Sequence, residues 1–184
     1  PHKFFISTTF NSILSKPYIK IKKNKKINYT ILNSINTLFK TSYTMKEFDL
    51  NNIDKKFFIE SERLLPNKNY IGFSINQGNV YRKKEFPLDK IIKISNEFIK
   101  NNKTPVFLIE KKFQELKNKI KSSIPSALFP EHESNLNSPA LVSCLGKRLD
   151  LAITIDNGIM HMLSLSKVPI ISLFGPTDAE KFAP

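Results

Sequence analysis

The chain has 184 residues, of which 40% are hydrophobic and 24% are charged, a composition typical of a globular protein. No hydrophobic run approaches the roughly 20 residues of a membrane-spanning helix, so these residues contain no such helix. A single cysteine, Cys144, excludes an internal disulfide framework and a cysteine-based zinc site, and is consistent with a reducing compartment.

The formal net charge of +13, with a pI near 9.8, allows two interpretations. One is a nucleic-acid-binding protein, because such proteins carry basic surfaces. The other is the codon bias of an AT-rich genome, because the basic residues are lysines except for Arg63, Arg82 and Arg148. Surfaces that bind nucleic acid usually recruit arginine for bidentate contacts. Codon bias is therefore favoured, and attraction of the lysines to an anionic membrane surface is kept as an alternative.

Residues 1–66 show scattered hydrophobic residues, a lysine-rich stretch at 16–26, and no alternation of strands with helices. Residues 66–69 are rich in turn-forming types and are predicted to be a linker. The chain starts at a proline and stops inside a predicted loop, so we expect it to be a piece of a longer protein.

From residue 67 onward, strands and helices alternate. Short apolar runs predict strands at 71–75, 105–109, 151–155 and 168–174, with a weak strand near 127–129. Helical spacing of apolar residues predicts helices at 87–101, 110–121, 138–149 and 158–166. Ser138 is the expected cap of the third helix, and Pro139 its first residue. This alternation predicts a doubly wound α/β domain, whose apolar strands form a parallel sheet with helices on both faces.

Ligands of such sheets bind beyond the carboxyl ends of the strands. The strand at 151–155 is followed by Asp156, Asn157 and Gly158, and a helix then begins with His161 in its first turn. A glycine permits a tight turn, and the helix N-terminus offers N–H groups to a phosphate. Periodicity alone instead favours Asp156 as a simple helix cap, and a lone histidine is more often structural than catalytic. The loop that follows 168–174 is expected to open on the same edge as Asp156.

Two further loops carry candidate ligands at this edge. The loop after 71–75 contains Gln77, Gly78 and Lys84, and this lysine is suited to an anion, or belongs to a solvated basic loop. Glu110 ends the strand at 105–109, where a carboxylate accepts hydrogen bonds from ribose hydroxyls in dinucleotide-binding folds. An acid beside a helix N-terminus is the equally supported alternative for Glu110.

Several motifs are absent from the sequence. It has no G-x-G-x-x-G fingerprint, no G-x-x-x-x-G-K-[ST] phosphate loop and no G-x-S-x-G elbow. It also has no D-x-D, H-x-H or H-E-x-x-H pattern that would hold a metal. What remains is a metal-free diphosphate site built from lysine and helix termini.

These features in this order resemble glycosyltransferase family 9, the ADP-heptose:lipopolysaccharide heptosyltransferases. The family carries a D-[ST]-G-x-x-H loop, a strand and then F-G-P-T, and this chain reads D-N-G-I-M-H at 156–161 and F-G-P-T-D at 174–178. The family's K-x-W-P element is similar to Lys84-Glu85-Phe86-Pro87. The chain departs from the family at Asn157, which stands where threonine or serine is usual, and at Phe86, which replaces a tryptophan.

The resemblance implies the GT-B architecture, in which two Rossmann-like domains face each other across a cleft. Residues 1–66 would be the remnant of the amino-terminal, acceptor-side domain and its linker, and residues 67–184 a truncated donor-binding domain. The resemblance implies that Lys84 neutralises the donor phosphates and Glu110 holds the ribose. The other donor-binding residues that it implies are Gln77, Gly78, Asn137, Asp156, Asn157, Gly158 and His161.

The implied reaction is metal-independent and inverting: an acceptor hydroxyl attacks the anomeric carbon, and the nucleoside diphosphate leaves. The family's general base is an aspartate early in the amino-terminal domain, so no catalytic base is assigned here. The implied donor is an ADP-sugar, with no further cofactor, and the acceptor is a lipopolysaccharide core or another glycan. This places the work in the cytoplasm, with peripheral contact at the inner membrane.

Three alternatives remain open. One is a glycosyltransferase that uses another nucleotide sugar, because Glu110 would read the ribose and not the base. The second is a non-catalytic relative that binds nucleotide sugars. The third, a nucleic-acid-binding module, is disfavoured because carboxylates at Asp156 and Glu110 would repel a phosphate backbone.

Overall fold

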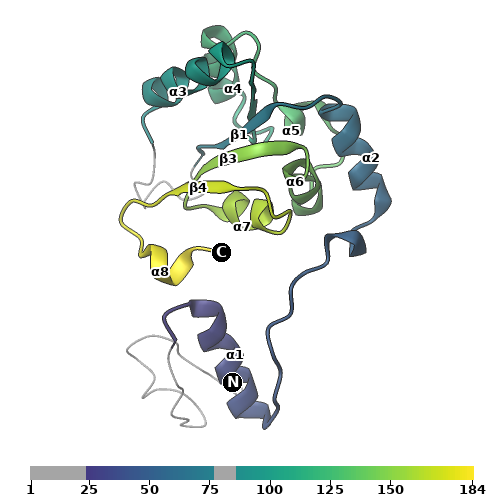
Figure 1. Cartoon of the computed structure of the whole chain (residues 1–184), viewed down its shortest axis with the longest axis vertical. Coiled ribbons are helices and arrows are strands. Elements are labelled where there is room, and N and C mark those ends of the chain that lie inside the picture. Colours follow the sequence, from purple (N-terminus) through teal and green to yellow (C-terminus); the bar gives the residue numbers. More distant parts are fainter. Residues whose placement is uncertain (1–23, 77–85) are drawn as a thin grey trace. The chain divides into compact units, whose positions relative to one another are not determined.

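The computed structural model describes residues 24–76 and 86–184 (Figure 1). The chain divides into two compact units, residues 1–47 with 178–183, and residues 48–177 with Pro184. In the first unit, α1 (Ile27–Phe39) and α8 (Ala179–Phe182) are the described helices. Lys25, just before α1, forms an ion pair with Glu180 of α8, with 3.1 Å between Lys25 Nζ and Glu180 Oε2. We call the second unit the sheet unit.

The sheet unit is built on four parallel strands. They are β1 (Tyr70–Ser74), β2 (Thr104–Phe107), β3 (Leu149–Ile155) and β4 (Ile170–Leu173), and they lie side by side in the order β2-β1-β3-β4. This confirms the predicted parallel sheet and each of its four main strands. The weak strand expected near 127–129 is reduced to one parallel bridge between Leu128 and Val106.

Four of the helices in the sheet unit were expected from the sequence. They are α3 (Leu88–Lys100), α4 (Gln114–Ser123), α6 (Pro139–Gly146) and α7 (Gly158–Ser164). Ser138 caps α6 as predicted, because its Oγ accepts a hydrogen bond of 3.1 Å from the backbone N–H of Ala140. The expected start of α4 at residue 110 is wrong by four residues, since Glu110 instead closes a turn by accepting from the N–H of Phe113.

Three further elements of the sheet unit were not expected. They are η2 (Leu50–Asn52), α2 (Lys55–Leu64) and α5 (Pro130–Glu133). Among the described residues, none of the helices combines the length and the apolar character that crossing a bilayer requires.

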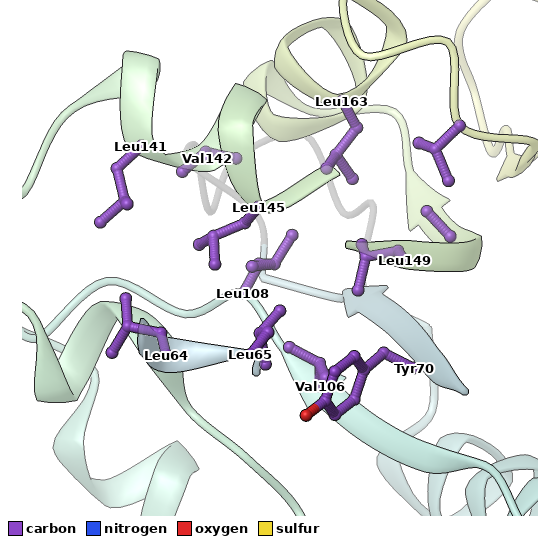
Figure 2. Packing of buried hydrophobic residues seen from close by; sticks show 12 residues of the cluster. Leu64, Leu65, Tyr70, Val106, Leu108, Leu141, Val142, Leu145, Leu149 and Leu163 are labelled. Atoms are coloured by element: carbon purple, nitrogen blue, oxygen red, sulfur yellow. The ribbon is translucent and has the colours of Figure 1, made fainter. Parts of the chain in front are cut away.

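Alternate side chains of the strands belong to two hydrophobic clusters, one on each face of the sheet. On β1, Tyr70 belongs to the cluster that Leu64, Leu141 and Leu163 complete from α2, α6 and α7 (Figure 2). Phe73 points to the other cluster, which includes Ile91 of α3 and Ile120 of α4. Since side chains alternate across a strand, this pattern shows that the sheet is covered on both faces, as a parallel sheet requires.

The helix α2 packs with the sheet unit, although the sequence-based division at 66/67 assigned it to the preceding region. Leu64 and Leu65 are buried in the cluster with α6. The guanidinium of Arg148 donates to the backbone oxygens of Leu65, Pro66 and Asn67 at 3.0–3.1 Å. The segment predicted to be a linker is therefore fixed to the start of β3, and the sheet unit begins at Phe48.

Two glycines in the sheet unit provide a matched pair for testing how closely α6 and α7 pack. A Cβ on Gly146 would lie 2.3 Å from Ser166 Oγ and 2.9 Å from Ser166 Cβ, whereas a Cβ on Gly158 would meet only Met162 Cε, at 4.0 Å. We expect Gly146→Ala to lower the free energy of unfolding by about 1–3 kcal/mol through overpacking. Gly158→Ala should raise it by roughly 0.4–1 kcal/mol, because alanine restricts the unfolded chain. Urea unfolding of both variants tests the pair, and equal effects would contradict the close packing at Gly146.

Candidate functional site

The ends of three neighbouring strands are joined by side-chain hydrogen bonds. Beyond β4, the hydroxyl of Thr177 donates to Oδ2 of Asp156, which directly follows β3. Beyond β3, the amide of Asn157 donates to Ser74 Oγ at 2.8 Å and to the backbone oxygen of Asn76 at 3.0 Å, at the end of β1. The loops after β3 and β4 thus open on the same edge, as the sequence predicted.

Asn157 also starts α7. Its Oδ1 accepts a hydrogen bond of 3.1 Å from the N–H of Met160, so Asn157 is the N-cap. The interpretation of Asp156 as the helix cap is therefore wrong. Asp156 is 9% exposed and its carboxyl group accepts the hydrogen bond from Thr177, which ties the loop after β4 to the end of β3.

Gly158 and His161 lie on the exposed side of α7. Gly158 does not use the conformational freedom that the sequence analysis expected of it, because no described glycine has a positive φ. Its Cβ position faces nearly open space, so packing within the described protein does not require a glycine there. A bound group that approaches the start of α7 closely would require one.

A pocket of about 410 Å³ lies beside this edge. We call it the Glu110 pocket. It brings together Glu110 and Asn137, two residues that the sequence analysis placed at the donor site. Its remaining lining residues are Lys111, Lys112, Glu131, Ser138, Pro139, Val142, Ile159 and Met162. The carboxylate of Glu110 forms an ion pair of 2.7 Å with Lys112 Nζ and is about half exposed.

Glu131 is an unexpected member of this pocket. It lies on the short helix α5, is only 9% exposed, and its Oε1 has no hydrogen-bond partner in the structure. Burial, with a smaller contribution from the negative charge of Glu110, raises the pKa of the Glu131 carboxyl to about 7. The pocket therefore holds two carboxyl groups of different character: Glu110 is half exposed and paired with Lys112, whereas Glu131 is buried and has a raised pKa.

His132 follows Glu131 on α5. Its ring lies edge-on to Phe129, with centroids 6.3 Å apart, and its buried Nε2 has no hydrogen-bond partner among the described residues. Burial and the nearby Lys117 and Lys111 lower the pKa of His132, which keeps its imidazole neutral.

A second pocket, of about 380 Å³, lies at the end of β1. It is lined by Ile75, Asn76, Phe86, Pro87, Leu88 and Leu116. Phe86 and Pro87 are the described residues of the Lys84-Glu85-Phe86-Pro87 element, and Phe86 packs against the cluster between the sheet, α3 and α4. The predicted phosphate ligands Gln77, Gly78 and Lys84 lie outside the described residues.

The structure therefore places the predicted residues in two groups at one edge of the sheet. Glu110 and Asn137 line the Glu110 pocket, whereas Asp156, Asn157, Gly158 and His161 lie at the start of α7, which contributes Ile159 and Met162 to that pocket. In residues 24–76 and 86–184, no three His, Cys, Asp or Glu side chains gather as metal ligands.

The sequence analysis assigned no role to Ser74, Thr177 or Glu131. Thr177 belongs to the F-G-P-T motif at 174–178, and Ser74 lies in the predicted strand 71–75, so their positions are a weak signal for partners of Asp156 and Asn157. Nothing in the local sequence marks Glu131.

The model of glycosyltransferase family 9 (heptosyltransferase) matches residues 14–184. The chain belongs to this family. A search of curated protein sequences gave no significant match.

Solved structures of similar fold include the family 9 glycosyltransferase from Veillonella parvula. It has a TM-score of 0.68 and 18% identity, over 92% of this chain and 51% of its own. The E. coli ADP-heptose LPS heptosyltransferase II has a TM-score of 0.59 and 18% identity, over 72% of this chain and 41% of its own. The E. coli heptosyltransferase WaaC, solved with ADP, has a TM-score of 0.59 and 15% identity, over 87% of this chain and 48% of its own.

The chain thus spans about half the length of the solved structures that it matches. The likeness confirms the predicted fold class, an α/β fold of the GT-B type. Whether residues 1–66 are acceptor-side and residues 67–184 donor-side stays a prediction.

Proposed function

We propose that the sheet unit binds the nucleotide-sugar donor of an inverting, metal-independent glycosyltransferase. The proposed donor is an ADP-activated heptose or related sugar, and the acceptor is a lipopolysaccharide core or another glycan. The observation that carries the proposal is the position of the Glu110 pocket beside the linked ends of β1, β3 and β4. Ligands of parallel α/β sheets bind at this edge.

The chemistry of the edge fits the parts of such a donor. Glu110 offers carboxylate oxygens to ribose hydroxyls, and the apolar side chains of Val142, Ile159 and Met162 offer a surface to a base. The first N–H groups of α7 have no partners within the helix, so they are suited to the diphosphate. Lys84 would add a positive charge there.

In the proposed reaction, an acceptor hydroxyl attacks the anomeric carbon as the bond from that carbon to the diphosphate oxygen breaks. A base takes the hydroxyl proton, and no residue of this chain is assigned to that step. Negative charge grows on the leaving diphosphate, where Lys84 and the start of α7 would stabilise it. No metal enters the proposal because the sequence offers no D-x-D pair.

The test is calorimetric titration of ADP, UDP and GDP into the chain, with and without a metal chelator. We expect saturable binding of ADP that the chelator leaves unchanged. Lys84→Ala should weaken binding about tenfold or more, because a hydrogen bond to a charged group is lost. Lys90→Ala, at an exposed lysine of α3, is the matched control and should bind like the unchanged chain.

The variant Asp156→Ala tests the residues at the start of α7. Circular dichroism must first show that this variant folds. We expect weaker ADP binding, since Asp156 and Thr177 together shape the loops after β3 and β4. A preference for UDP or GDP would keep the glycosyltransferase but change the donor. Absence of nucleotide binding by the folded chain would contradict the proposed donor site.

A further inference from the structure

The Glu110 pocket contains a buried group that the proposed reaction does not use. Glu131 is more than nine-tenths buried, lines the pocket, and has one carboxyl oxygen, Oε1, without any hydrogen-bond partner. A buried polar atom without a partner costs free energy, so such an atom in a pocket calls for a reason. The neighbours of Glu131 across the pocket include Asn137 and Glu110, which are the proposed nucleoside ligands.

The surroundings of Glu131 favour its neutral form. A carboxylate there would be largely removed from water, in a pocket that the apolar Pro139, Val142 and Met162 also line, and would be repelled by the negative charge of Glu110. These conditions raise its pKa to about 7, so the group is neutral or half neutral under ordinary conditions. A neutral carboxyl differs from a carboxylate in one decisive way, since it carries an O–H donor.

We propose that Glu131 binds the nucleoside of the donor as a neutral carboxylic acid, donating a hydrogen bond to an acceptor atom of the nucleoside. This inference rests on the proposed function. The buried Oε1 is then the carbonyl oxygen, which is less costly to leave without a partner than half of a carboxylate. The hydroxyl is left for the ligand, and every nucleobase exposes at least one acceptor atom to receive it.

A nucleoside diphosphate is itself an anion, which reinforces this assignment. If Glu131 stayed ionised, the pocket would bring two carboxylates and the diphosphate of the ligand into one region. Protonation of Glu131 removes one of these charges and supplies a donor in its place. Binding of the nucleotide and binding of a proton by Glu131 are therefore coupled, and each favours the other.

The other charged groups around the pocket set the background for a pH experiment. Lys111 and Lys112 belong to the loop of Glu110, and Lys112 is paired with Glu110 at 2.7 Å. On the same turn as Glu131, His132 has a lowered pKa and is neutral near pH 7. Lys117 of α4 acts on His132. Glu131 is the group at this pocket whose pKa is raised to about 7, so we expect it to change charge in the neutral pH range.

The first test compares ADP binding to Glu131→Gln and Glu131→Met. The amide of glutamine keeps a neutral donor, so Glu131→Gln should bind ADP within about threefold of the unchanged chain, whereas Glu131→Met should bind it roughly fivefold to tenfold more weakly. Glu133→Met, at an exposed glutamate of the same turn, is the matched control and should leave binding unchanged. Thermal unfolding shows that the variants fold, and Glu131→Met should not unfold at a lower temperature, because it removes an unpartnered buried oxygen.

The second test is the pH dependence of ADP affinity. Because the neutral form binds and the pKa of Glu131 is about 7, the affinity of the unchanged chain should fall as pH rises, by about fivefold between about pH 7 and pH 8. The ADP phosphate also titrates in this range, and it does so equally for both proteins. The ratio of the ADP affinities of the unchanged chain and Glu131→Gln at each pH therefore reports the titration of Glu131 alone. Glu131→Gln itself should lack this decline.

Two results would overturn the inference while the proposed function stands. One is ADP binding that Lys84→Ala weakens but Glu131→Met does not. The other is equal loss in Glu131→Gln and Glu131→Met, which would show that the carboxylate form binds. Failure of the folded chain to bind any nucleotide would overturn both the inference and the proposed function.

Discussion

Replacing Phe107 with alanine should lower the free energy of unfolding of the sheet unit by about 3–5 kcal/mol. Phe107 is fully buried at the end of β2. Its ring is stacked between Phe73 of β1 and Phe129, with centroids 5.1 Å and 5.7 Å apart. Alanine would leave a cavity and remove both aromatic contacts, and such contacts add stability beyond the buried area. Urea unfolding followed by circular dichroism measures the change.

Two controls make this result specific. Phe107→Leu keeps most of the volume and should cost less than about 1.5 kcal/mol. Phe39→Ala removes a ring that is 59% exposed at the end of α1, and should change stability by no more than about 0.5 kcal/mol. A loss below about 1 kcal/mol in Phe107→Ala would show that the stack does not hold β1 and β2 together, since buried phenylalanine normally contributes far more.

The position of Phe107 also connects the core to the site. Leu108 and Ile109 follow it and are fully buried, and Glu110 comes next at the pocket. The strand end that presents Glu110 is therefore anchored by three consecutive buried side chains.

The sheet was predictable because parallel strands covered on both faces must be nearly continuous apolar runs. The strand that ends at Ile155 and the one that ends at Leu173 are such runs, and their place in the sheet followed from the helix between them. The helix α2 was missed for the opposite reason. Ile59 on α2 is 67% exposed, and Ser61 and Leu64 are the residues buried within it, so its sequence shows little of the spacing that marks a core-facing helix.

The site was only partly predictable. The motif of Asp156, Asn157 and Gly158 follows a predicted strand, which placed it correctly at the sheet edge. The role of Asn157 as cap was not distinguishable from that of Asp156, because both residue types cap helices. The burial of Glu131 could not be predicted from the sequence, because it depends on how the segment between α4 and α6 packs. A glutamate in a polar stretch is ordinarily exposed, and only the packing of α5 shows otherwise.

Replacing Asn157 with alanine should lower the free energy of unfolding by about 2–4 kcal/mol. One side chain here performs two tasks. Its Oδ1 caps α7, and its Nδ2 donates to Ser74 Oγ and Asn76 O at the end of β1. Ser74 is fully buried, so water does not replace the lost partner in the variant. The cap is worth about 0.5–2 kcal/mol, and each orphaned group adds roughly 1 kcal/mol.

A second variant separates the two tasks. Asn157→Thr introduces the residue type usual in the family, whose hydroxyl caps a helix but has no amide to donate to the end of β1. We expect it to recover about 1 kcal/mol of the loss, which is the share of the cap. Asn118→Ala removes an exposed asparagine that accepts from Gln114 Nε2 at 3.0 Å, and as the matched control should change stability by no more than about 0.5 kcal/mol.

The pattern across these variants decides what the asparagine contributes to the site. If Asn157→Thr were as stable as the unchanged chain, the link from Asn157 to β1 would contribute nothing, and the cap alone would explain the alanine variant. If it is intermediate, the amide supplies a connection between β1 and β3 that a threonine lacks. The end of β1, at Ser74 and Asn76, would then be held to the start of α7 by Asn157 itself. ADP affinity should in that case fall in Asn157→Thr although its helix cap is intact.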